Sequence, residues 1–122
     1  MSNKEIEDSL QFIKNSRRAH ERFHFVTGVT VTSSRGSFQG KSNNLSLGGL
    51  FLTLPEKLEV GEIIEIRLEL PGIEESIVKG EVRWSIPKSD NEVGCGLKFT
   101  GLTSSVMKAI VTLSSEAELR EI

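Results

Sequence analysis

Hydrophobic and polar residues alternate with a period of two through most of the middle of the chain. The clearest stretch alternates aliphatic with charged residues: Ile64, Glu65, Ile66, Arg67, Leu68, Glu69 and Leu70. This alternation predicts a β-strand with one buried and one solvated face. Weaker versions predict strands at 23–32, 37–41, 50–54, 78–86 and 93–99, and the turn composition at 33–36 favours a hairpin between the first two.

The last two predicted strands, 78–86 and 93–99, each have a further set of residues predicted to face the core. In 78–86 the alternation assigns the buried side to Val78, Val82, Trp84 and Ile86, and in 93–99 to Val93, Cys95, Leu97 and Phe99. Trp84 is the only tryptophan of the chain, and this pattern predicts it in the core. Six successive strands would leave exposed edges in an open sheet, so we expect a closed antiparallel barrel.

Both ends of the chain change to a helical period. Near the start, Ser2 and Glu5 have capping-box spacing, and Ile6, Leu10 and Ile13 share a helical face, which predicts a short helix within 1–16. After Gly101 a second apolar face predicts a helix over 103–120, capped by Thr103 or Ser104: Val106, Ile110, Leu113 and Ala117. The predicted fold is therefore mainly β, a barrel over 23–101 with a C-terminal and a short N-terminal helix.

Composition restricts the classes of partner. The 122 residues suit one domain, and the net charge of −2 argues against binding a nucleic acid polymer, which requires a basic surface. Positive charge is concentrated in 14–22, where Glu21 is the single acidic residue and four residues are basic: Lys14, Arg17, Arg18 and Arg22. A local basic patch on an acidic protein favours a small, highly charged ligand.

Other chemistry is restricted in the same way. Cys95 is the only cysteine, so an intrachain disulfide or a cysteine zinc site is excluded, and His20 and His24 without clustered carboxylates make a poor metal site. No apolar run approaches the ~20 residues of a membrane span, and residues 1–5 lack the apolar core of a signal peptide. These features predict a cytoplasmic protein without a bound metal.

Two short motifs carry the strongest functional signal. Arg18 and Arg22 stand four residues apart, and Asn44, Ser46 and Gly49 follow in an Asn-x-Ser-x-x-Gly turn between predicted strands. Their order and spacing resemble the PilZ domain, a bacterial receptor for cyclic di-GMP, over roughly 14–115. The resemblance implies a six-stranded split barrel, a ligand-binding loop at 17–22 and a PilZ-like domain over 17–120.

The arginine loop matches the ligand that this resemblance implies. Cyclic di-GMP presents phosphates and guanine edges rich in acceptors, and a guanidinium can form two parallel hydrogen bonds to either. The resemblance assigns Arg18 and Arg22 to the ligand, and Arg17 as an additional contact on which the number of bound ligands depends. The alternative is a solvated helical turn with an ion pair between Arg17 and Glu21.

The second motif also has a structural alternative. Asn44, Ser46 and Gly49 are ordinary turn residues, and Gly49 can serve either by adopting φ > 0 or by letting a ligand approach the backbone. The resemblance assigns all three to the ligand site. Many similar domains have Asp where this chain has Asn44. Compared with aspartate, the asparagine side chain keeps a hydrogen-bond acceptor and adds donors. For Trp84 the resemblance implies an alternative to a buried core position, in which the indole stacks on a guanine of the ligand.

The predicted function is a cyclic di-GMP receptor, not an enzyme, that changes conformation and relays the signal to a protein of the motility, pilus or exopolysaccharide machinery. No catalytic set or cofactor motif is apparent, and the expected state is a monomer or a ligand-linked dimer. One alternative is a PilZ-fold interaction adaptor that does not bind the nucleotide. Another is a small barrel that binds oligonucleotides, which would need aromatic residues along a basic groove.

Overall fold

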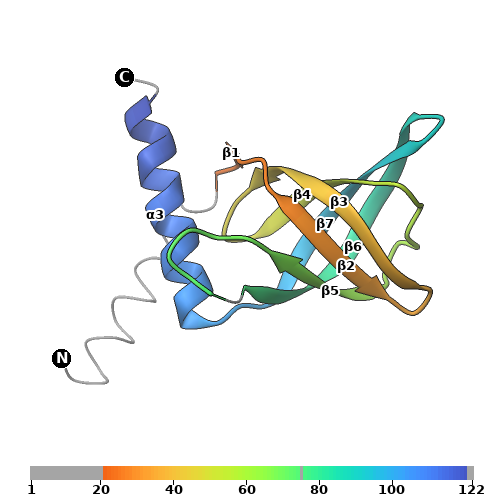
Figure 1. Ribbon diagram of the computed structural model, residues 1–122, viewed down its shortest axis with the longest axis horizontal. Coiled ribbons are helices and arrows are strands. Elements are labelled where there is room, and N and C mark those ends of the chain that lie inside the picture. Colours follow the sequence, from red (N-terminus) through yellow and green to blue (C-terminus); the bar gives the residue numbers. More distant parts are fainter. Residues whose placement is uncertain (1–20, 75, 121–122) are drawn as a thin grey trace.

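A computed structural model of the chain describes residues 21–74 and 76–120. It is mainly β, with a single described helix at the C-terminal end (Figure 1). The predicted helix within 1–16 and the first part of the loop at 17–22 lie outside the described residues. The elements are β1 Phe23–His24, β2 Gly28–Ser33, β3 Gly36–Leu45, β4 Gly49–Leu54, β5 Ile63–Leu68, β6 Ile77–Ser89, β7 Glu92–Gly101 and α3 Ser104–Arg120.

The strands form a closed antiparallel barrel. The order is β1-β3-β2-β5-β6-β7-β4, and an additional pairing of β3 with β4 closes a ring of six strands, β2 to β7. Closure gives the backbone groups of each barrel strand partners on both sides over much of its length. The six-stranded barrel predicted from the alternation is therefore confirmed, with β1 as a short additional strand on the edge of β3.

Ser42 explains why the strand predicted at 23–32 divides into β1 and β2. Its buried hydroxyl donates to the carbonyl of Phe25 at 2.6 Å and accepts from the amide of Thr27 at 2.9 Å. Two backbone hydrogen bonds join the same segment to β3, from the Phe25 amide to the Asn43 carbonyl at 3.0 Å and from the Ser42 amide to the Thr27 carbonyl at 2.9 Å. The Ser42 side chain therefore adds to the backbone bonds where the regular ladder is interrupted. The connection holds the start of the described chain against the barrel.

The core follows the predicted alternation and extends under α3. Ile64, Ile66 and Leu68 are buried while the intervening residues are exposed. The helix covers one end of the barrel (Figure 1) and buries Val106, Met107 and Ile110 against it. The Thr103 hydroxyl accepts from the Val106 amide at 3.2 Å, so Thr103 is the N-cap. Within the described part of the chain, no helix has the length and apolar character needed to cross a membrane.

One predicted strand face is wrong in its second half. Val82 pairs with Leu97, but Trp84 pairs with Gly96, so β6 contains one more residue than β7 between these pairs. The extra residue is a β-bulge, and it reverses the side on which the following residues lie. Val82 is fully buried, whereas Ile86 is 52% exposed and Trp84 is half-buried on the outer face. The core assignment of Trp84 and Ile86 is therefore corrected.

Candidate functional site

A surface pocket of about 290 Å³ lies where the start of β1, the β3–β4 turn and the outer faces of β6 and β7 meet. Its lining includes Arg22, Ser46, Gly49 and Trp84. These four are residues for which the sequence predicted a ligand-binding role, and they come from three segments far apart in the chain. The barrel topology brings them together, because β4 pairs with β7 and β7 pairs with β6.

The β3–β4 turn is built around the side chain of Ser46. Its buried hydroxyl accepts hydrogen bonds from the amides of Gly48 at 3.1 Å and Gly49 at 3.2 Å. The backbone closes the same turn, because the Ser46 amide donates to the Gly49 carbonyl at 3.0 Å. With both acceptor positions of the hydroxyl occupied, the hydroxyl hydrogen is the group that remains for another partner. The turn is therefore both structural and able to present a donor.

Position 49 requires glycine because of a close backbone approach and not because of a positive φ, the first reason that the sequence suggested. The described glycines with positive φ are Gly36, Gly61 and Gly72, so Gly49 does not use a left-handed conformation. A side-chain carbon at Gly49 would overlap the carbonyl oxygen of Leu97 on β7. The close approach at this position is thus made by a neighbouring strand, and it packs the turn tightly against β7.

A single row of paired residues connects Asn44 of the turn motif with Trp84 across the outer face. Asn44 on β3 pairs with Phe51 on β4, Phe51 pairs with Gly96 on β7, and Gly96 pairs with Trp84 on β6. Asn44 is half-buried, and it also pairs with the exposed His24 of β1. The described lining of the pocket does not include Asn44, so the structure places it in the same row but not at the pocket wall.

The Trp84 side chain contacts residues of two other strands, β7 and β4. A side-chain carbon at Gly96 would overlap the Nε1 edge of the indole, so the ring occupies the space above this glycine. The indole also packs against Phe51, with ring centroids 4.9 Å apart and planes tilted by 32°. This distance is within the range of offset aromatic pairs. Trp84 therefore forms one wall of the pocket and is supported from behind by a second aromatic ring.

Two pocket cations were not among the residues that the motifs predicted. Arg83 is the extra residue in the β6 bulge, and Lys98 follows on the outer face of β7. The Nη1 atom of Arg83 lies 3.2 Å from the Oε2 atom of Glu81, and Glu81 is the cross-strand partner of Lys98. Alternation already placed Lys98 on the solvated side. It placed Arg83 on the solvated side as well, and strand pairing was needed to bring the two cations to the same pocket.

Comparison with known proteins identifies the family. The model of the PilZ domain family matches residues 16–116, most of the chain. The chain belongs to the PilZ domain family. The resemblance drawn from the two motifs is thereby confirmed. No curated protein matches the sequence.

Solved structures share the fold at low sequence identity. The inhibitor of motility MotI (DgrA) of Bacillus subtilis has a TM-score of 0.72 and 19% identity, over 86% of this chain and 53% of that one. The PilZ domain of YcgR from Escherichia coli, solved with c-di-GMP, has a TM-score of 0.64 and 13% identity, over 87% and 95%. The PilZ domain of CeSA from a cellulose-synthesizing bacterium has a TM-score of 0.56 and 22% identity, over 80% and 98%. This chain spans about half the length of the Bacillus protein.

The PilZ arginine motif is only partly within the described residues. Arg22 is exposed and lines the pocket directly before β1, whereas Arg17 and Arg18 lie outside the residues that the structure describes. Across 21–74 and 76–120, the His, Cys, Asp and Glu side chains form no group of three or more that could hold a metal ion. The chemistry available at the described part of the site is therefore cationic, hydrogen-bonding and aromatic.

Proposed function

We propose that this PilZ domain is a receptor for cyclic di-GMP, which binds in the pocket between Arg22, the β3–β4 turn and Trp84. The observation that carries the proposal is that Arg22 and the turn residues Ser46 and Gly49 line one pocket. These residues belong to two motifs separated in sequence, and a purely structural role for each would not require them to meet. In support, the similar PilZ domain of YcgR was solved with c-di-GMP.

The charge of the pocket suits the phosphates of the ligand. Arg22, Arg83 and Lys98 line it, on a protein whose net charge is −2. Guanidinium groups bind phosphate oxygens or the O6 and N7 atoms of guanine through paired hydrogen bonds. We assign Arg18 and Arg22 to these contacts, with Arg17 as an additional contact that sets whether one or two ligands bind. On binding, the loop at 17–22 closes over the pocket.

The polar and aromatic groups complete the assignment. The Ser46 hydroxyl, with its acceptor positions occupied by the turn, donates to a phosphate oxygen. Trp84 stacks on a guanine, since its indole forms a wall of the pocket. Asn44 reaches the ligand from the same outer row as Trp84, and Gly49 holds the turn close to β7.

The receptor passes its signal to a partner protein by a conformational change at the arginine loop, and the proposal includes no catalytic step. The name of the similar Bacillus protein, an inhibitor of motility, favours a motility partner over pilus or exopolysaccharide machinery. We propose a bacterial, cytoplasmic protein that is a monomer or a ligand-linked dimer. The alternative is an adaptor of the same fold that binds its partner without the nucleotide.

Calorimetric titration with cyclic di-GMP tests the proposal. Arg18→Ala and Arg22→Ala should each weaken binding by about 1.5–3 kcal/mol, roughly ten- to a hundredfold, because charge-assisted hydrogen bonds are lost. Arg35→Ala is a matched control, because Arg35 is an exposed arginine that bonds Glu59 and the Lys57 carbonyl instead of lining the pocket. Full affinity in both motif variants would reject this site, and no heat from the wild type at high micromolar concentrations would favour the adaptor.

A further inference from the structure

Phe51 is a half-buried aromatic residue on the outer face of β4 that does not line the pocket. Its ring packs against Trp84, which does. We propose that Phe51 is a positioning residue, which holds the Trp84 indole in the orientation that receives a guanine base. This inference rests on the proposed function, because it concerns how the same pocket recognises a base, and it adds a residue that neither motif contains.

The strand beneath the two rings leaves space for them. Gly94 and Gly96 are successive outward positions of β7, and both lack a side chain. A side-chain carbon at Gly96 would overlap the indole of Trp84, and one at Gly94 would be 3.2 Å from the Cζ atom of Phe51. The two rings therefore lie close above the β7 backbone, Trp84 from β6 and Phe51 from β4. Neither ring can move toward the barrel.

Lys88 also contacts the ring of Phe51. Its Nζ atom lies 5.8 Å from the centroid of the Phe51 ring, a distance typical of cation–π contacts. The same Nζ donates to the Thr53 hydroxyl at 2.9 Å, and that hydroxyl donates to the Asn43 side-chain oxygen at 2.8 Å. Because the lysine is itself held by this chain of hydrogen bonds, Phe51 contacts a restrained cation as well as the indole of Trp84.

This restraint matters because Trp84 is on the outside of the barrel. An aromatic side chain there loses rotational freedom when a base stacks on it, and that loss weakens binding unless the ring is already held in place. Phe51 supplies the holding contact without touching the pocket. A change at Phe51 should therefore alter both the mobility of the indole and the affinity for a ligand with a base, while the charges of the pocket stay the same.

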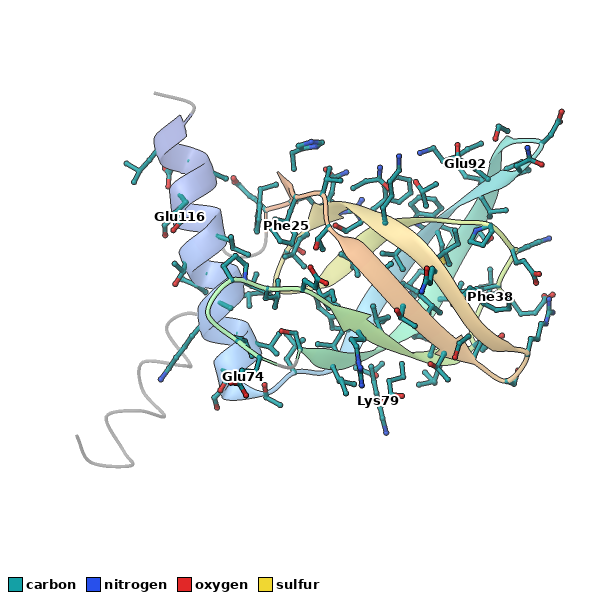
Figure 2. The ribbon with its side chains drawn as sticks, in the orientation of Figure 1. Phe25, Phe38, Glu74, Lys79, Glu92 and Glu116 are labelled. Atoms are coloured by element: carbon teal, nitrogen blue, oxygen red, sulfur yellow. The ribbon has the colours of Figure 1, made fainter. Side chains whose placement is uncertain are left out.

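The test compares Phe51→Leu with Phe51→Tyr, which keeps the ring. Phe38→Leu is the matched control, because Phe38 is a half-buried phenylalanine at the end of the barrel opposite α3 (Figure 2). In the unliganded protein, acrylamide quenching of the single tryptophan should increase in Phe51→Leu alone. Calorimetry should show cyclic di-GMP affinity reduced about three- to tenfold in that variant, part of the contribution of one stacked base. Phe51→Tyr should remain close to wild type in both measurements.

The possible results separate this inference from the proposed function. Wild-type quenching in Phe51→Leu overturns the inference, as does increased quenching with unchanged affinity. Failure of the wild type to bind cyclic di-GMP would instead overturn the proposed function and, with it, the role toward a guanine, while quenching would still report whether Phe51 holds the indole. Urea unfolding checks that each variant is folded, and Phe51→Met replaces Phe51→Leu if the leucine variant is not.

Discussion

The indole of Trp84 lies over Gly96, its cross-strand neighbour, in the space that any other residue at position 96 would fill with a side chain. The relationship depends on the β6 bulge, which turns Trp84 to the outer face where Gly96 also faces. The indole at position 84 thus requires a glycine at position 96. Together they make a wall of the pocket, and each constrains what the other position tolerates.

Gly96→Ala should displace the indole. The added carbon overlaps Trp84, and overpacking of this kind costs about 1–3 kcal/mol of unfolding free energy. We expect lower stability in urea, altered tryptophan emission and weaker cyclic di-GMP binding. Gly101→Ala on the same strand is the control, because an added carbon there meets nothing within 4 Å. Equal effects of the two substitutions would contradict the relationship between Trp84 and Gly96.

Adjacent glycines of the β3–β4 turn should respond differently to alanine. At Gly49 the added carbon overlaps the Leu97 carbonyl oxygen, while at Gly48 its nearest neighbour is the Ser46 hydroxyl at an ordinary 3.7 Å. Gly49→Ala should therefore lower the free energy of unfolding by about 2 kcal/mol or more, and Gly48→Ala by about 0.5 kcal/mol or less. Chemical denaturation measures both, and similar values would be inconsistent with the close packing of the turn on β7.

Removing the Glu81 carboxylate should strengthen ligand binding. Glu81 pairs with Arg83 at 3.2 Å, so a phosphate that approaches Arg83 must compete with this carboxylate. The pair is exposed and worth at most about 1 kcal/mol, which limits the gain for Glu81→Gln to about two- to fivefold. The gain should shrink as salt concentration rises, because salt screens exposed charges.

Glu59→Gln is the control for the Glu81 experiment. Glu59 pairs with Arg35 at 2.8 Å, and neither residue lines the pocket. It removes the same charge from a comparable exposed pair, so any general effect of net charge on affinity should appear in both variants. Calorimetry that finds the same affinity change in the two variants would show that Glu81 does not compete with the ligand.

Stability should decrease at alkaline pH because of Cys95. Burial, and secondarily the charge of Glu62, raise the pKa of the Cys95 thiol from 9.0 to about 11. The unfolded chain therefore releases this proton at lower pH than the native protein, so the contribution is complete below pH 9 and is lost as pH rises through 11. At about 1.4 kcal/mol per pKa unit, the loss approaches 2–3 kcal/mol.

Urea unfolding between pH 8 and pH 11 measures this contribution. Lysines also titrate in this range, so the comparison is with Cys95→Val, which lacks the thiol and keeps a similar apolar volume. The difference in slope between the two proteins isolates the thiol. Parallel curves would mean that Cys95 does not titrate differently in the folded and unfolded chains.

The barrel was predictable where burial follows a strict alternation. In β5 the period of two assigns Ile64, Ile66 and Leu68 to the core, and the structure agrees. The alternation failed in β6 because a bulge depends on which residues the neighbouring strand presents, and this information is not local. The division of β1 from β2 was missed for the same reason, since it depends on Ser42 of a different strand.

The candidate site was predictable to a similar extent. The resemblance carried by the two motifs assigned Arg22, Ser46 and Gly49 to the ligand, and these three line one pocket. Arg83, Lys98 and the support of Trp84 by Phe51 have no signature in sequence, because they meet only through strand pairing. The reason for glycine at position 49 likewise became clear only when β7 was seen against the turn.

The sequence by itself determined the class of fold and the family and suggested the candidate site, because alternation and turn residues are local patterns and the motifs are recognised from their residues and spacing. Tertiary structure alone decided the face on which Trp84 lies and which cations and aromatic residues surround it. The physical reason is the β6 bulge: one extra residue between the Val82–Leu97 and Trp84–Gly96 pairs reverses the side on which Trp84 and Ile86 lie. A residue that the local pattern assigns to the core therefore becomes a wall of the pocket.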